Sequence, residues 1–138
     1  MKLLDTNVVI YARTPESPFH KWASEIIASI VESEGACINA ASLSELCAAA
    51  LDPATVAASV QSFGIELVDI PHACAPMCGA AFGKYAQARK LNSGKDAPKM
   101  PLPDFFIGAH AELMGWEIVT NDTNRFSTYF PKVSLVTP

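Results

Sequence analysis

Two hydrophobic patterns alternate along the chain. Short apolar runs are separated by longer segments in which apolar residues recur every three or four positions. The short runs predict buried strands, and the longer segments predict helices. Strands are expected at Lys2–Leu4, Ala36–Asn39, Glu66–Ile70, Glu117–Thr120 and Val133–Val136.

Local signals set the ends of several predicted helices. Pro53 suits the first turn of a helix, Asn92-Ser93-Gly94 stops a long one, and Gly115 closes another as its C-terminal cap. A loop containing three prolines and a glycine leads up to Pro103. The helices are expected through Val8–Ala12 and at Phe19–Ser33, Ser42–Leu51, Pro53–Phe63, Ala73–Leu91 and Asp104–Met114.

This order of elements predicts an α/β fold, in which a parallel sheet carries helices on both faces. The chain has 138 residues, 50% of them hydrophobic, and no change of composition separates two halves. Residues 1–138 are therefore expected to form a single domain. Folds of this class place their sites beyond the carboxyl ends of the strands, where the strand order switches.

Neither a membrane span nor a secretion signal is predicted. The longest apolar runs are far shorter than the roughly 20 residues that cross a bilayer. The first acid, Asp5, comes too early for a signal peptide. A soluble, cytoplasmic protein without a membrane partner is expected.

The four cysteines allow more than one interpretation. Cys37, Cys47, Cys74 and Cys78 could form two disulfides, or part of them could join His72 in a soft-metal site. Their spacing matches no zinc pattern, and their neighbours are apolar. We expect buried free thiols.

Acidic residues are predicted to meet at one edge of the sheet. Asp5 directly follows the first strand, and Asp122 follows the fourth by two residues. Glu45 is expected in the first turn of the helix after the second strand, and Asp104 opens the helix before the fourth. Strand ends and helix starts lie on the same rim of such a fold, so residues that are far apart in sequence converge there.

Carboxylates gathered in this way would repel one another unless a cation lay among them. A hard divalent ion prefers oxygen ligands, and without His or Cys at these positions Mg²⁺ or Mn²⁺ is favoured over Zn²⁺. Such an ion suits phosphodiester hydrolysis, because it activates water and offsets charge on the leaving oxygen.

Each acid also has a structural interpretation. Ser42-x-x-Glu45 fits a capping box, Asp104 suits a helix dipole, and Asp122 could be a turn aspartate. The structural explanation is weakest for Asp5, because a charge that ends a central apolar strand is costly unless it is paired. The joint pattern favours a metal site.

Four segments carry a family resemblance across nearly the whole chain. They are Leu3-Leu4-Asp5-Thr6-Asn7-Val8, Ser42-Leu43-Ser44-Glu45-Leu46, Leu102-Pro103-Asp104-Phe105-Phe106-Ile107-Gly108-Ala109-His110-Ala111 and Val119-Thr120-Asn121-Asp122-Thr123-Asn124-Arg125-Phe126. Together they resemble the PIN-domain nucleases and, within them, the VapC ribonuclease toxins of bacterial toxin–antitoxin systems.

The resemblance implies a three-layer α/β/α fold with a five-stranded parallel sheet in the order 3-2-1-4-5. It implies an endoribonuclease whose catalytic and metal-binding residues are Asp5, Glu45, Asp104 and Asp122, with Asn7 and Thr120 orienting ligands or water. It also implies a homodimer neutralised by a small cognate VapB-like antitoxin. Asn121 departs from the family, where many relatives have a basic residue, and this puts a substrate contact in doubt.

The net charge of −4 and the pI near 5.2 are unusual for a protein that binds nucleic acid. Without the four site acids, however, the balance is neutral, and half of the basic residues fall between positions 84 and 99. This stretch fits either a phosphate backbone or a solvated helix face. The predicted RNA contacts are Lys84, Arg89, Lys90, Lys95, Lys99 and Arg125. His110 is expected to serve the core and not a metal.

Three other functions fit parts of the pattern. The chain could be a housekeeping RNA-processing nuclease of PIN type, or a PIN-like interaction module without catalysis. A phosphatase with Asp5 as its nucleophile would need a second aspartate two residues later, where Asn7 stands.

Overall fold

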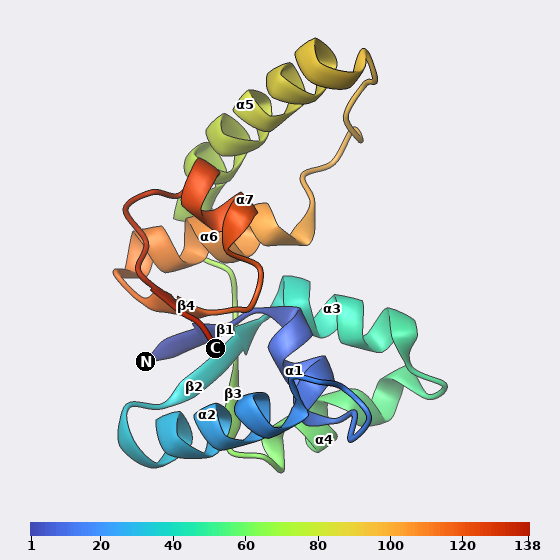
Figure 1. Cartoon of the computed structure of the whole chain (residues 1–138), viewed down its shortest axis with the longest axis vertical. Coiled ribbons are helices and arrows are strands. Elements are labelled where there is room, and N and C mark those ends of the chain that lie inside the picture. Colours follow the sequence, from blue (N-terminus) through green and yellow to red (C-terminus); the bar gives the residue numbers. More distant parts are fainter.

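A five-stranded parallel sheet forms the centre of the computed structural model, which describes residues 1–138 (Figure 1). The strands are β1 (Lys2–Leu4), β2 (Ala36–Asn39), β3 (Ile65–Val68), β4 (Glu117–Val119) and β5 (Leu135–Val136). Their order is β3-β2-β1-β4-β5, which confirms the predicted 3-2-1-4-5 sheet. The chain's connections change direction between β1 and β4, so these neighbouring strands mark the switch point. The fifth strand is shorter than predicted.

One face of the sheet is covered by the helices of the first half of the chain. These are α1 (Thr6–Ala12), α2 (His20–Ser33), α3 (Ala40–Ala49) and α4 (Val56–Gln61), the last preceded by a single 3₁₀ turn, η1 (Pro53–Thr55). Leu4, Ile38 and Val119 point from the sheet into this layer of the core. In α2, Ile27 and Ile30 are buried as the helical spacing predicts.

The other face is covered by the helices of the second half (Figure 1). These are η2 (His72–Cys74), a 3₁₀ turn, then α5 (Ala75–Ser93), α6 (Pro103–Met114) and α7 (Thr123–Tyr129). Leu3, Cys37 and Ile118 point into this layer. Because successive strand residues face opposite sides, Leu3 and Leu4 supply the two layers from adjacent positions.

The start of α3 differs from the sequence-based expectation. The helix begins at Ala40, and Asn39 is its N-cap, whose Oδ1 accepts hydrogen bonds from the backbone N–H groups of Ala41 (3.0 Å) and Ser42 (3.3 Å). The alternative interpretation of Ser42 and Glu45 as a capping box is therefore wrong. Glu45 lies in the second turn of the helix, and its carboxylate is free of any capping role.

Helix α7 was not among the predicted elements. Asp122 caps it by accepting a hydrogen bond from the backbone N–H of Asn124 (3.2 Å), and Phe126 on its inner face is fully buried. Phe130, just after the helix, lies so close to α6 that a Cβ added at Gly108 would come within 2.1 Å of its ring. This contact fixes the distance between α6 and the end of α7.

His110 and three of the four cysteines are buried in the core, as predicted, whereas the prediction is wrong for Cys47. The amide of Asn39 donates to Nδ1 of His110 (3.3 Å), and the imidazole packs beside Trp116. All four cysteines are free thiols. Cys37, Cys74 and Cys78 are buried, while Cys47 is half-buried. Burial raises the pKa of the Cys37 thiol to about 12, with a smaller contribution from Glu66.

Helix α5 extends well beyond the rest of the molecule (Figure 1). It ends at Gly94, whose φ of 69° is the left-handed conformation of a C-terminal cap. The following segment returns to the body of the protein and leads into α6. None of the helices has the length and apolar character needed to cross a membrane.

Candidate active site

Asp5 lies at the carboxyl end of the central strand β1 and is only 3% exposed. Its Oδ2 accepts a hydrogen bond from the Thr120 hydroxyl (2.8 Å), just beyond β4. Burial raises the pKa of Asp5 to about 6, against the hydrogen bond from Thr120, which lowers it. The nearby charges of Asp104 and Glu45 raise this pKa further. Asp5 is thus a buried carboxyl group surrounded by like charge.

Asp104 lies in the first turn of α6, directly after Pro103. Its Oδ2 accepts a hydrogen bond from Nη1 of Arg125 on α7 (2.9 Å), in a partly exposed ion pair. Burial raises the pKa of Asp104, Arg125 opposes this shift, and the charge of Asp122 adds to it. Asp104 therefore already has a positive charge beside it, the guanidinium of Arg125.

The two remaining acids lie around this pair. Glu45 reaches the same edge of the sheet from α3, on the opposite face from α6, and is half-buried. Asp122 is exposed at the start of α7. The pKa effects show that Glu45 and Asp104 lie near Asp5, and that Asp122 lies near Asp104.

The four predicted acids thus share one neighbourhood at the carboxyl edge of β1 and β4. In this arrangement no group of three or more Asp, Glu, His or Cys side chains lies close enough together to hold a metal ion. These four residues are called the ring of acids below. One of them, Asp104, already forms an ion pair with Arg125.

The oxygen-only donors of this ring fit a hard divalent cation better than a soft one. A second observation supports the fit. The hydroxyl of Thr6, directly after Asp5, is buried without a hydrogen-bond partner. A buried hydroxyl without a partner beside a buried carboxyl marks a polar site whose hydrogen bonding is incomplete.

The two predicted supporting residues differ in their surroundings. Thr120 is fully buried, and besides its bond to Asp5 its Oγ1 accepts a hydrogen bond from the backbone N–H of Asp122 (3.0 Å). It therefore links two of the acids. Asn7 is exposed on α1 and makes no side-chain hydrogen bond, so its supporting role stays a prediction.

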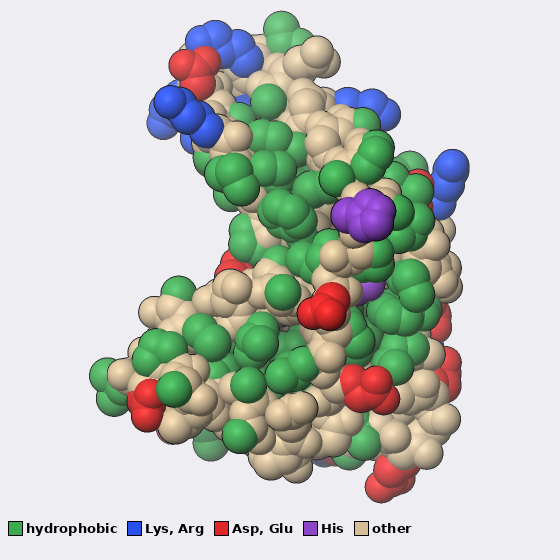
Figure 2. Space-filling model, turned by 180° about the vertical axis from the view of Figure 1, so that it is seen from behind, with side chains coloured by type: hydrophobic (Ala, Val, Ile, Leu, Met, Phe, Trp, Pro, Cys, Tyr) green, Lys and Arg blue, Asp and Glu red, His purple; other side chains and the backbone are tan.

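The predicted RNA contacts do not form one lip beside the acids. Lys90 forms an ion pair with Asp96 (3.1 Å) near the outer end of α5, and Lys95 follows at its tip. Figure 2 shows Lys and Arg side chains gathered there, above a hollow that separates this end of α5 from the part of the molecule carrying α3. Lys84 lies further back on α5, and Lys99 lies in the segment that returns to α6. Only Arg125 contacts a candidate acid.

Arg89 connects this basic end of α5 to the site. Its Nη1 donates to the hydroxyl of Tyr85 (3.1 Å). The guanidinium of Arg125 in turn lies over the Tyr85 ring, 5.2 Å from the ring centroid. Sequence reasoning did not select Tyr85. Its place one helical turn before Arg89 was the available signal, since residues four apart share a helix face.

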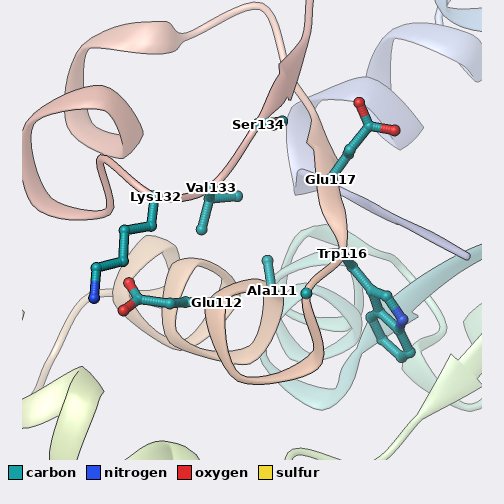
Figure 3. Close-up of a pocket in the computed structure, with 8 residues that line it drawn as sticks. Ala111, Glu112, Trp116, Glu117, Lys132, Val133 and Ser134 are labelled. Atoms are coloured by element: carbon teal, nitrogen blue, oxygen red, sulfur yellow. The ribbon is translucent and has the colours of Figure 1, made fainter.

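A small cavity of about 170 Å³ lies elsewhere, at the amino end of β4. Figure 3 shows Glu112, Trp116 and Lys132 around it. The acids lie beyond the opposite ends of the strands, so this cavity is not part of the candidate site.

Comparison with known proteins shows the family and the fold of the chain. The PIN domain family matches residues 2–130. The chain therefore belongs to the PIN domain family, which is a family of nucleases. No curated protein sequence matches it.

Several solved structures share the fold. FitAcB from Neisseria gonorrhoeae is 21% identical with a TM-score of 0.66, covering 100% of this chain and 98% of that one. A toxin–antitoxin complex from Klebsiella pneumoniae gives the same four values. DNA-bound VapBC from Salmonella typhimurium is 23% identical with a TM-score of 0.63, covering 99% and 98%.

Proposed function

We propose that this protein is an endoribonuclease that hydrolyses RNA phosphodiester bonds with Mg²⁺ or Mn²⁺, and that it is the toxin of a VapBC-type toxin–antitoxin pair. The observation that carries the proposal is the buried Asp5 carboxyl at the switch point of the sheet. It lies within the electrostatic reach of Glu45 and Asp104, which come from helices on opposite faces.

The candidate acids would hold the cation: Asp5, Glu45, Asp104 and Asp122. A divalent ion supplies positive charge that keeps these carboxylates ionised together and activates water for attack on phosphorus. Thr120 orients Asp5 through the 2.8 Å hydrogen bond. Arg125 holds Asp104 and presents further N–H donors toward a phosphate backbone.

The toxin part of the proposal rests on the solved structures that share the fold. The structures from Klebsiella pneumoniae and Salmonella typhimurium are toxin–antitoxin or VapBC complexes. By analogy we propose a small VapB-like antitoxin as partner, a homodimer as the assembly and the cytoplasm as the location.

Cleavage of a labelled RNA tests the catalytic part. We expect cleavage with Mn²⁺ or Mg²⁺, none in EDTA, and none by Asp5→Asn. Asp69→Asn, which removes an exposed carboxylate outside the site, is the matched control and should cleave normally. Cleavage that persists in chelator would refute the metal-dependent mechanism, and hydrolysis of small phosphomonoesters alone would indicate a phosphatase.

Thermal unfolding provides a readout that does not depend on turnover. A cation that binds only the folded state raises the melting temperature. Mn²⁺ should therefore stabilise the wild type and Asp69→Asn, and should have little effect on Asp5→Asn. An equal shift in all three proteins would show that the ion binds elsewhere.

The toxin part has its own test. Expression of the chain should arrest bacterial growth, and co-expression of the reading frame next to its gene should restore it. Growth arrest without rescue by that neighbour, or no arrest at all, would favour a housekeeping RNA-processing role.

A further inference from the structure

A cavity of about 320 Å³ opens beside the ring of acids, between α5 and α7. Of the five cavities in the molecule, it is the only one lined by a candidate acid, Asp122. Its other lining residues are Tyr85, Asn124, Arg125, Thr128 and Tyr129. The proposed function assigns the acids but leaves this cavity without a role.

Two aromatic rings form one wall of the cavity. Tyr85 and Tyr129 meet edge to face, with ring centroids 5.9 Å apart. Both rings also pack on Phe105, at 5.3 and 5.5 Å, and Phe105 is fully buried directly after Asp104. Packing on the buried Phe105 therefore fixes both tyrosine rings relative to Asp104.

Arg125 forms the side of the cavity nearest Asp104. Its guanidinium lies 5.2 Å from the ring centroid of Tyr85 and 5.8 Å from that of Phe105, while Nη1 binds Asp104. A guanidinium has five N–H donors, and the Asp104 contact is its only hydrogen bond within the protein. The remaining donors are available to an anion.

We propose that this cavity is a nucleotide subsite, which binds the RNA nucleotide next to the bond to be cleaved. The base would stack on one of the two tyrosine rings, which stand nearly at right angles to each other, because aromatic rings stack with any base. Its phosphate would meet Arg125, and Asn124 offers a side-chain amide to the edge of the base. The inference rests on the proposed function for the position of the cleaved bond, while binding of a nucleotide can be measured without cleavage.

The volume and the surroundings both favour this occupant. A space of about 320 Å³ lies at the lower end of the range for small-ligand sites, which suits a single nucleotide. The hydroxyl of Tyr85 is held by Arg89, so cationic groups continue from the cavity along α5 toward Lys90. A phosphate backbone leaving the subsite would follow this line of positive charge.

Filling the cavity is a sharper test than removing its wall, because both tyrosines also support the core. Thr128 is exposed on α7 and lines the cavity, so Thr128→Trp should fill it. Ser127 is also exposed on the same helix but does not line the cavity, so Ser127→Trp is the matched control. Melting curves should show both variants folded.

Binding is measured in EDTA by following the ring signals of Tyr85 and Tyr129 by NMR. AMP and UMP should shift these signals in the wild type and in Ser127→Trp. In Thr128→Trp the affinity should fall by about tenfold, which lies within the range for losing one stacked base. Ribose 5-phosphate, which lacks a base, should bind much more weakly than either nucleotide.

Cleavage then places the subsite in the reaction. Thr128→Trp should raise the KM for a short RNA by about tenfold, while Ser127→Trp should leave it unchanged. Ribose 5-phosphate binding as well as AMP would overturn the base-binding assignment, as would identical behaviour of the two tryptophan variants. If nucleotides bind as expected but the wild type cleaves no RNA, the subsite stands and the proposed nuclease function fails.

Discussion

The Thr120 hydroxyl and the Asp5 carboxylate are joined by a 2.8 Å hydrogen bond that connects the carboxyl ends of the neighbouring strands β4 and β1. Both residues are buried, so this bond is the main polar contact that favours the ionised form of Asp5. The same hydroxyl also accepts a hydrogen bond from the backbone of Asp122. The Thr120 side chain thus fixes the position of Asp5 relative to the backbone of Asp122.

Replacing Thr120 by Val should raise the pKa of Asp5 above its value of about 6, because burial then acts without the opposing hydrogen bond. Leaving a buried carboxylate short of a donor should also lower the free energy of unfolding at pH 7.5 by about 1–3 kcal/mol. Carboxyl NMR and urea unfolding measure the two effects. Thr123→Val, at an exposed position on α7, should change neither.

Asp5→Asn should stabilise the protein at neutral pH when no divalent ion is present. The folded state keeps the Asp5 proton up to about pH 6, whereas the unfolded state releases it near pH 3.8. The free energy of unfolding of the wild type therefore falls as the pH rises through this window, and the neutral variant escapes the loss. A shift of about two units corresponds to at most about 3 kcal/mol.

Urea unfolding in EDTA at pH 4 and pH 7.5 measures this difference. The advantage of Asp5→Asn should be present at pH 7.5 and should shrink toward pH 4, while Asp69→Asn shows no comparable gain. Gross destabilisation of Asp5→Asn at pH 7.5 would count against like-charge repulsion and burial as the cause of the raised pKa.

Arg125→Gln should raise the pKa of Asp104 further, because burial and the charge of Asp122 would then act without the ion pair. The variant should be less stable at neutral pH by less than about 1 kcal/mol, since the pair is partly exposed. The loss should diminish in acid, where Asp104 is protonated in both proteins. Carboxyl NMR reports the pKa, and Arg13→Gln at an exposed site is the control.

Gly108→Ala should destabilise the protein by about 3 kcal/mol, because the added Cβ would overlap the buried ring of Phe130. Gly83→Ala on α5 is the matched control, since nothing lies within 4 Å of its Cβ position. There the change should stabilise the helix by up to about 1 kcal/mol. Equal melting temperatures for the two variants would show that α6 and Phe130 can separate without cost.

Most of the fold could be predicted because the apolar periods are strong and the central strands β1, β2 and β4 are buried on both faces. The sheet order came from the family resemblance and agrees with the structure. Helix α7 was missed because Thr123 and Asn124 are weak helix formers. The apolar spacing of Phe126, Tyr129 and Phe130 was its available signal.

The site was only partly accessible to the same reasoning. The rim argument brings the acids to one edge of the sheet, because it needs only the positions of strand ends and helix starts. It cannot show that Arg125 binds Asp104, since this contact depends on the unpredicted helix α7. Asn39 is the last residue of β2, as predicted, and it also caps α3, a role that an Asn before an apolar helix signals.

The sheet separates two helical layers, yet the ring of acids draws members from both. Glu45 comes from the layer of α1–α4, whereas Asp104 and Asp122 come from the layer of α5–α7. An ion bound between them would link the two layers at the carboxyl edge of the sheet and oppose sliding of one layer across the other. Shear between the layers would in turn dismantle the ring without unfolding either of them.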